Sequence, residues 1–389
     1  MTSPEPPPDA AHLSLDALVD DPGVQVVVCC GAGGVGKTTT SAALALRAAE
    51  RGRKVVVLTI DPARRLAQSM GIEQLDNTPR PVPGVRPGGG SLDAMMLDMK
   101  RTFDEVVEAQ ASPERAQQIL GNPFYVTLSS SFAGTQEYMA MEKLSQLRRD
   151  AQRTGRWDLI VVDTPPARSA LDFLDAPERL SGFLEGRFIR LLLAPAKGPA
   201  RFVTAGVGAV TSTMAKIVGA QVLKDLQLFV AAFDTLFGGF RNRAQQTYEV
   251  LQTKETAFLV IAAPEPDALR EAAYFVERLR AERMPLAGLV VNRATLGSQR
   301  LSAEDAAAAA ERLVPRAPDG GADSSGTASL TAGLLRLHAD RMRRVTRERR
   351  LRDDFRTSHP EVATVVVPAL ASDVHDLDGL RQVGELLAG

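Results

Sequence analysis

The stretch Gly31-Ala32-Gly33-Gly34-Val35-Gly36-Lys37-Thr38 matches the pattern G-x-x-x-x-G-K-T over its full length. It follows the apolar run Val24–Cys30 and precedes the Ala/Leu-rich run Thr39–Glu50, so it lies between a predicted strand and a predicted helix. Glycines let the backbone curl until consecutive N–H groups face one anion, and the positive end of the following helix points at the same place. The pattern therefore predicts a phosphate-binding loop within an α/β fold.

The residues of this loop have separate expected roles. The Lys37 ammonium is expected to reach the β- and γ-phosphates of a nucleoside triphosphate and to act in catalysis, and the Thr38 hydroxyl is expected to ligate Mg²⁺. Backbone N–H groups surround the phosphates. The predicted cofactors are a nucleoside triphosphate and Mg²⁺, and the predicted binding residues are Gly33, Gly34, Val35, Gly36, Lys37, Thr38 and Thr39.

The bulk composition is that of a soluble globular protein with a sizeable core. Of the 389 residues, 44% are hydrophobic and 24% are charged. The net charge of −1 argues against a protein that coats nucleic acid, so no nucleic-acid partner is expected. The Pro-rich, acidic start Met1–Ala11 is typical of a disordered tail and not of a signal peptide, and we assign residues 1–20 to this tail. Because no apolar run is long enough to span a bilayer, the sequence predicts a cytoplasmic protein.

Apolar runs alternate with helical patterns along the chain, as expected for a parallel sheet with crossover helices. Beyond the first strand, the expected strands are Lys54–Ile60, Leu92–Leu97, Asp158–Val162, Ala257–Ala262, Ala287–Val291 and Val362–Val367. Thr78–Gly90 is expected to be a flexible connection, and the pattern is helical throughout from Ser169 to about Thr253. The predicted architecture is a doubly wound, mostly parallel sheet of the P-loop NTPase type in two parts, residues 21–168 and 254–389, with a helical subdomain at 169–253 inserted between them.

Two aspartates at strand ends are candidates for chemistry that the loop cannot supply. Asp163 closes the hydrophobic strand Trp157–Asp163 and resembles a Walker B aspartate, which holds the metal; the alternative is a residue that caps the next turn. Asp61 ends the second strand, and an aspartate there faces the same sheet edge as the phosphates. We expect it to orient or activate the attacking water; the alternative is a helix N-cap before Pro62.

Several motifs occur in a characteristic order. The phosphate loop is followed by the D-P-A turn at Asp61 and the D-T-x-P turn Asp163–Pro166. A strand ending in Val290-Val291-Asn292 and a closing segment Val367–Leu370 come later. The set resembles the ArsA-like ATPases, which include the arsenical-pump-driving ATPase and the ATPase that targets tail-anchored membrane proteins. The likeness covers nearly the whole chain from Val24 onward.

The resemblance implies ATP as the nucleotide, a dimer, and the fold described above with its helical subdomain. It also implies that the carboxylate of Asp61 serves hydrolysis, that Asp163 serves the Mg²⁺ site and that Asn292 reads adenine. An amide suits adenine because it donates and accepts hydrogen bonds together. Taken alone, Asn292 at a strand end is as well interpreted as a turn residue.

The chain departs from the family pattern at three points. Where the family's loop usually carries a second lysine that reaches the partner subunit's nucleotide, this chain has Ala32. Either a related subunit supplies that charge or a nearby arginine does; the candidates are Arg64, Arg65 and Arg168. No C-x-x-C pair is present, so no zinc site is expected. Cys29 and Cys30 are adjacent in a strand and point to opposite faces, which argues against arsenite capture by converging thiols.

These observations lead to one main functional hypothesis. We expect an ATP-hydrolysing, dimeric ArsA-like ATPase that couples its nucleotide state to the binding of a hydrophobic or membrane-associated client. The apolar face within Phe202–Phe240 is a candidate client surface, although ordinary helix–helix core is the alternative. The Arg-rich stretch Arg341–Arg356 leaves open a peripheral contact with an anionic membrane. The rival hypotheses are a low-turnover, nucleotide-binding regulatory subunit paired with a lysine-bearing relative, and a chromosome- or division-positioning ATPase.

Overall fold

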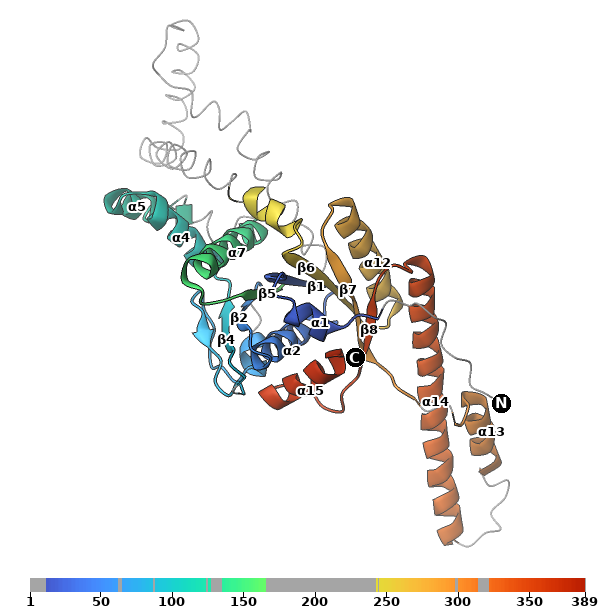
Figure 1. Ribbon diagram of the computed structural model, residues 1–389. Helices are drawn as coiled ribbons and strands as arrows, with labels where there is room; N and C mark the ends of the chain where they lie inside the picture. The colour runs from blue at the N-terminus through green and yellow to red at the C-terminus, as the bar shows by residue number, and fades with distance from the viewer. Residues whose placement is uncertain are drawn as a thin grey trace, which may run out of the picture.

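The computed structural model describes residues 12–61, 65–86, 88–123, 125–126, 135–165, 243, 245–297, 300–313 and 322–388. Its centre is an eight-stranded sheet with the order β3-β4-β2-β5-β1-β6-β7-β8 (Figure 1). The strands are β1 (Val26–Gly31), β2 (Lys54–Thr59), β3 (Arg80–Pro81), β4 (Ser91–Met96), β5 (Leu159–Asp163), β6 (Thr256–Ala262), β7 (Leu286–Ala294) and β8 (Thr364–Pro368). All neighbouring pairs are parallel except β3 with β4. The predicted doubly wound, mostly parallel sheet is confirmed.

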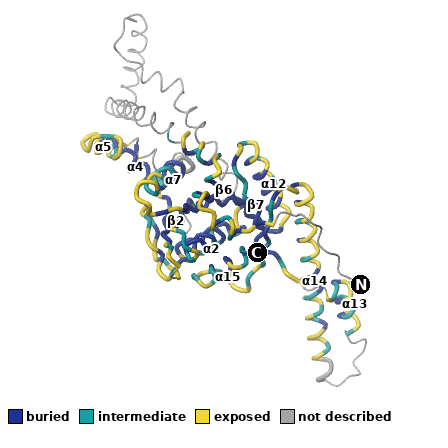
Figure 2. The backbone as a smooth tube through the Cα atoms, in the orientation of Figure 1, coloured by how far each residue is buried: buried dark blue, intermediate teal, exposed yellow. Residues whose placement is uncertain are grey.

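The central strands form because their sequences are almost entirely apolar. Every residue of β1, β5 and β6 is buried, as expected for a parallel sheet that is covered on both faces. Figure 2 shows this buried centre in dark blue, with exposed residues on the outer helices. Cys29 and Cys30 belong to the buried set, and burial raises the pKa of the Cys29 thiol to about 12.

Helices cover the two faces of the sheet. From β1 the chain crosses through α2 (Lys37–Glu50) toward β2, whereas from β6 it crosses through α12 (Pro266–Ala281) toward β7 on the other side of β1. Because such crossovers are right-handed, α2 and α12 lie on opposite faces. The closing helix α15 (Leu377–Ala388) packs beside α2. After β4 the chain forms α4 (Met99–Gln110), α5 (Pro113–Leu120) and α7 (Thr135–Thr154), and α4 packs against both α5 and α7. The short helix α3 (Arg65–Ser69) comes between β2 and β3 along the chain.

Two further helices form an arm outside the sheet. The helices α13 (Ala303–Leu313) and α14 (Ala322–Ser358) pack along each other and extend away from the strands (Figure 1). Three leucines on α14, at helical spacing, are exposed: Leu330, Leu334 and Leu337. Six of the eleven residues of α13 are alanine. None of the described helices is long and apolar enough to cross a membrane.

The prediction of a disordered tail over residues 1–20 was wrong for its last third. The helix α1 (Leu15–Asp20) begins at Ser14, whose side chain accepts a hydrogen bond from the Ala17 N–H. Leu15 and Val19 are both 0% exposed, and burying two such side chains stabilises the fold by about 1.5–3 kcal/mol each. The carboxylate of Asp16 pairs with Arg47 of α2. Behind the Pro-rich start lies a short amphipathic helix that packs against α2 and α15.

The expected flexible connection Thr78–Gly90 is also more ordered than its composition suggests. It contains β3, and two of its glycines, Gly88 and Gly90, pack directly on the end of α2. A Cβ at Gly88 would lie 2.2 Å from the carbonyl oxygen of Glu50, and one at Gly90 would lie 2.2 Å from that of Ala49. These glycines allow close backbone approach and do not mark a loose linker.

The predicted helical subdomain, residues 169–253, lies almost wholly outside the described residues, and so does the candidate client surface Phe202–Phe240. Residues 245–251, at its end, are helical. The domain boundaries therefore stay a prediction. The chain enters this insertion after β5 and returns from it into β6, and these are the two strands that pair with β1.

Candidate functional site

The G-x-x-x-x-G-K-T loop joins β1 to α2 at the carboxyl edge of the sheet. Two of its glycines are required by geometry. Gly31 has a φ of 149°, and a Cβ there would lie 2.0 Å from the Ile261 carbonyl oxygen of β6. Gly36 has a φ of 92° and would place a Cβ 2.3 Å from Nδ2 of Asn292. The loop is thus held tightly by β6 and β7 in a curled backbone, as phosphate binding requires.

Lys37 lies within the curl of this loop. Its side chain is buried, and its Nζ donates to the carbonyl oxygens of Gly31 at 2.9 Å and Ala32 at 2.8 Å. Burial lowers the pKa of Lys37, while nearby Asp163 opposes that shift. The ammonium is therefore positioned by the loop itself, beside the N–H groups that are expected to surround a phosphate.

Asp163 lies directly beneath the loop and is fully buried. Its Oδ2 accepts hydrogen bonds from Oγ1 of Thr38 at 2.8 Å and from Oγ1 of Thr59 at 2.9 Å. Ser41 Oγ lies 3.5 Å from Oδ1. Burial raises the pKa of Asp163 to about 6, although the threonine hydroxyls and Lys37 oppose that shift.

These contacts bear on the two interpretations of Asp163. The side chain of Asp163 accepts hydrogen bonds from Thr38 and Ser41, at the start of α2, and from Thr59 of β2. The turn that follows is held instead by Thr164, whose Oγ1 donates to the Cys29 carbonyl at 2.8 Å. A hydroxyl beside a buried carboxylate offers two hard oxygen ligands. This suits Mg²⁺, which is usually held by one or two protein ligands together with phosphates and waters. A cation there would also favour the ionised carboxylate.

A cleft with a volume of about 1050 Å³ opens over the loop. Its lining brings together the predicted site residues Gly33, Gly34, Gly36, Lys37, Thr38, Thr39, Asp61 and Asn292. Asp61 is half-buried, and its backbone N–H donates to Thr59 Oγ1 at 3.2 Å. Val35 takes part through its backbone, because its carbonyl accepts a hydrogen bond from Asn292 Nδ2 at 2.8 Å. The closing segment, Val367–Leu370, forms another wall of the same cleft.

A model of the family described as "Anion-transporting ATPase" matches residues 24–311. The chain belongs to this ArsA-like ATPase family. An ATPase GET3 of Malassezia globosa is 29% identical over 172 residues, which cover 44% of this chain and 48% of that protein. An arsenical pump-driving ATPase of Acidiphilium multivorum is 32% identical over 157 residues, or 40% of this chain and 26% of that protein. The chain thus spans about half, or less, of these relatives' lengths. The ATPase BagA of Mycobacterium tuberculosis is 24% identical over 321 residues, 82% of this chain and 77% of that protein.

Within this ArsA-like site, several residues that contact Asp163 or the phosphate loop were not predicted from the sequence. Thr59 and Ser41 surround Asp163, and Arg293 lines the cleft and donates from its NH1 to the Gly34 carbonyl at 2.9 Å. Thr59 carried a usable signal as a polar residue at the end of an apolar run, and in the structure it pairs in register with Asp163 across β2 and β5. Arg293 carried none. Of the three candidate arginines, Arg65 lines the cleft, and Arg64 and Arg168 lie outside the described residues.

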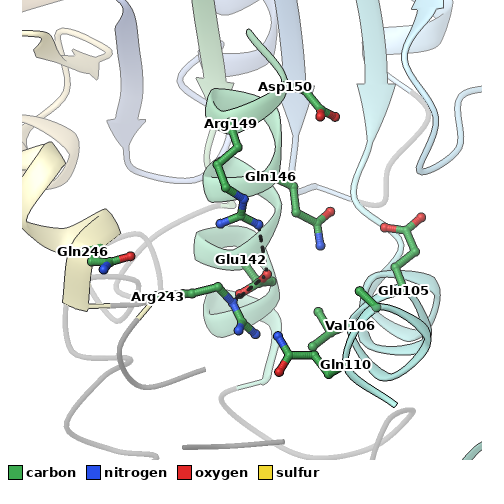
Figure 3. Close-up of a pocket in the computed structure, with 10 residues that line it drawn as sticks. Glu105, Val106, Gln110, Glu142, Gln146, Arg149, Asp150, Arg243 and Gln246 are labelled. Carbon is green, nitrogen blue, oxygen red and sulfur yellow. Dashed lines mark hydrogen bonds and ion pairs between the residues drawn. The ribbon is translucent and has the colours of Figure 1, made fainter. Parts of the chain in front are cut away.

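A second cavity, of about 630 Å³, lies away from the loop between α4, α7 and the chain that returns from the insertion. Figure 3 shows Glu142 of α7 between two guanidinium groups. Nε of Arg243 donates to its Oε2 at 2.8 Å, and NH2 of Arg149 lies 3.7 Å from its Oε1. Glu142 is buried, so its ion pair with Arg243 connects the returning segment to α7 away from solvent.

Proposed function

We propose that this protein is a Mg²⁺-dependent hydrolase that converts ATP to ADP and phosphate. The observation that carries the proposal is the hydrogen bond between Thr38 and the buried Asp163, directly beneath a complete phosphate loop. Backbone N–H groups of the loop and the Lys37 ammonium are suited to hold the triphosphate, and Thr38 and Asp163 are suited to hold the metal. Mg²⁺, when bound, neutralises charge on the β- and γ-phosphates.

In this proposal Asp61 acts on the attacking water. It lies in the same cleft as the loop, at the end of a strand, and is half-buried. A carboxylate there accepts a hydrogen bond from water and orients it toward the terminal phosphate. Asn292 binds the adenine in this proposal. Its Nδ2 donates to the Val35 carbonyl of the loop, and its Oδ1 is a further acceptor for the base. The Pro368–Leu370 wall offers apolar contact for a base.

We further propose that the protein works as a homodimer or as a heterodimer with a related ATPase, and that its nucleotide state controls the binding of a hydrophobic or membrane-associated client. Support comes from the position of the insertion. It starts after β5 and ends before β6, so both of its connections flank β1, which leads into the phosphate loop. A shift of the loop is therefore well placed to move the insertion.

The alternative is a low-turnover regulatory subunit that binds nucleotide and depends on a lysine-bearing relative. One observation favours it: Ala32 is buried and brings only a methyl group to the loop, so the loop itself supplies a single side-chain cation. Charge that develops on the phosphates in the transition state then has less stabilisation than a two-lysine loop gives.

Single-turnover hydrolysis separates these two hypotheses. The purified chain would be mixed with limiting ATP and Mg²⁺, alone and with a lysine-bearing relative, and phosphate release measured. Hydrolysis by the chain alone, abolished by chelation of Mg²⁺, supports the enzyme. Nucleotide binding with hydrolysis only in the mixture supports the regulatory subunit. If the chain neither binds nor hydrolyses ATP in either arm, both proposals fail.

Client binding needs its own test. Asp61→Asn is expected to keep ATP bound and to hold the protein in its ATP state, so a pull-down in ATP would enrich the client over wild type. Asp158→Asn, a change of the same kind on the exposed side of the domain, is the matched control. Equal recovery of hydrophobic proteins with the two variants would contradict the client proposal.

A further inference from the structure

The turn after β7 holds an arginine in an unusual backbone conformation. Arg293 has a φ of 61°, a left-handed conformation that costs a residue with a side chain about 1–3 kcal/mol. The register of β7 with β8 shifts between Val291 and Ala294, which leaves Arg293 out of the ladder. Conformations of this kind persist only where their surroundings impose them, and they concentrate at functional sites.

The surroundings of this turn impose the conformation from both sides. On the C-terminal side, the N–H and Oγ1 of Thr295 donate to the carboxylate of Glu348 on α14, at 2.7 and 2.8 Å, and Glu348 is buried. The Ala294 carbonyl accepts from the Ala369 N–H at 2.9 Å. On the N-terminal side, Asn292 donates to the loop carbonyl of Val35. The turn is thus fixed between the phosphate loop and α14, with Arg293 at its centre.

The side chain of Arg293 reaches the phosphate loop. Its NH1 donates to the Gly34 carbonyl at 2.9 Å, and the residue is exposed and lines the cleft. A guanidinium has five N–H donors, so one bond to Gly34 leaves donors for a ligand in the cleft. Gly34 lies in the middle of the loop, between the predicted anion-binding residues Gly33 and Val35.

Arg293 differs from the other positively charged side chains that line the cleft. Among the described lining residues, the lysine and arginine side chains are Lys37, Arg65 and Arg293. Lys37 is buried and already donates to two loop carbonyls. Arg293 is the one of these cations that is both exposed and bonded to the outer part of the loop. An arginine binds phosphate oxygens in a bidentate manner and keeps its charge, which suits it to this position.

We propose that Arg293 is a phosphate-binding residue that supplies the second side-chain cation of the loop in cis. Its guanidinium contacts the outer phosphates of the bound nucleotide while the strained turn keeps it over Gly34. This inference rests on the proposed nucleotide binding. The end of β7 would then contribute a phosphate contact in addition to the contact of Asn292 with the loop. The positive charge of Arg293 would replace, within one chain, the charge that Ala32 lacks.

The test is nucleotide affinity by calorimetry on the full chain with Mg²⁺. Arg293→Gln removes the charge and keeps a polar side chain of similar length. We expect the affinity for a non-hydrolysable ATP analogue to fall about 10- to 100-fold, the range for a lost charged hydrogen bond. The loss should be smaller for ADP and within about twofold of wild type for AMP, because the lost contact is to the outer phosphates. Arg283→Gln is the matched control: Arg283 is exposed with a φ of 57°, but it lines a different cavity.

The outcomes separate this inference from the proposed function. If wild type binds nucleotide and Arg293→Gln binds the ATP analogue equally well, the role of Arg293 is overturned and the proposed function stands. An equal loss for ATP analogue, ADP and AMP would also overturn it, since that result means the side chain only braces the loop. If wild type binds no nucleotide at all, the proposed function falls, and this inference with it. Thermal unfolding of each variant checks that the fold is intact.

Discussion

Replacing Asp163 by asparagine should stabilise the free protein and abolish its response to Mg²⁺ and ATP. Burial raises the pKa of Asp163 from 3.8 to about 6. At about 1.36 kcal/mol for each pH unit, ionising this carboxylate costs the folded state about 3 kcal/mol. This cost already includes the attraction between Asp163 and Lys37, which opposes the shift. We therefore expect Asp163→Asn to raise the free energy of unfolding by about 1–3 kcal/mol at pH 7.

The pH dependence gives the sharper test. Below pH 3.8, Asp163 is protonated in the folded and unfolded states, so its ionisation costs nothing. As pH rises from 3.8 to about 6, the unfolded state loses the proton first and wild type loses stability relative to the variant. Above about pH 6 the carboxylate is ionised in both states, and the full difference persists. The advantage of the variant should thus develop between pH 4 and 6 and then stay constant.

Asparagine can satisfy the same neighbours. Its Oδ1 can accept from the hydroxyls of Thr38 and Thr59, and its Nδ2 can donate to Ser41 Oγ, whose own hydrogen goes to the Lys37 carbonyl at 2.8 Å. The loss of charge is therefore the main change. Without that charge, the metal has a weaker site, and saturating Mg²⁺ and ATP, which would add about 3 kcal/mol to wild type at a hundredfold excess over the Kd, should add almost nothing to the variant.

Urea unfolding followed by the fluorescence of Trp157, the single tryptophan of the chain, measures these differences. Trp157 is buried just before β5, so it reports on the same strand. Thr59→Val is a useful companion, since it removes one hydrogen bond to the carboxylate and keeps the charge. A variant Asp163→Asn that is less stable than wild type at pH 7, or a difference that does not change between pH 4 and 6, would refute the reasoning.

Three further predictions follow from the same geometry. Asp61→Asn should bind ATP as wild type does but hydrolyse it about 10²–10⁴-fold more slowly in single-turnover assays; unchanged hydrolysis would remove Asp61 from the mechanism. Gly36→Ala should distort the loop, because Gly36 has a φ of 92° and a Cβ there would lie 2.3 Å from Asn292 Nδ2. Calorimetry should then detect no nucleotide binding, while the far-UV circular dichroism stays native. Leu15→Ala should lower the free energy of unfolding by about 2–5 kcal/mol because this side chain is fully buried, and a loss below about 0.5 kcal/mol in urea titrations would mean that α1 does not pack on α2.

The sheet was predictable because its signals are local. Each central strand is a continuous apolar run, and each meets a helix through a short connection, so periodicity identifies both the elements and their parallel arrangement. The phosphate loop is equally local, since its glycines and Lys37 are neighbours in the chain. Strand boundaries differed by one or two residues, apart from β7, which continues from Val291 to Ala294.

The features that were missed depend on distant partners. The helix α1 has only six residues, and its burial depends on α2 and on α15 at the far end of the chain. Gly88 and Gly90 look like a linker because nothing in their sequence reveals the backbone of α2 beside them. Arg293 contacts Gly34 across 259 residues, so no spacing rule reaches it. The composition of each segment reflects only its own residues. The structure of these segments is decided by packing against elements that are distant in the sequence.

The pairing of β1 with both β5 and β6 has a consequence for how the protein is made. On the ribosome, β5 emerges first and gives β1 one neighbour, but the other side of β1 stays unpaired until β6 appears roughly 90 residues later. At ordinary translation rates this lasts about 5–20 s. For that time the nascent chain presents a Val-rich edge, which is the kind of surface that chaperones bind and that aggregates when it is left uncovered.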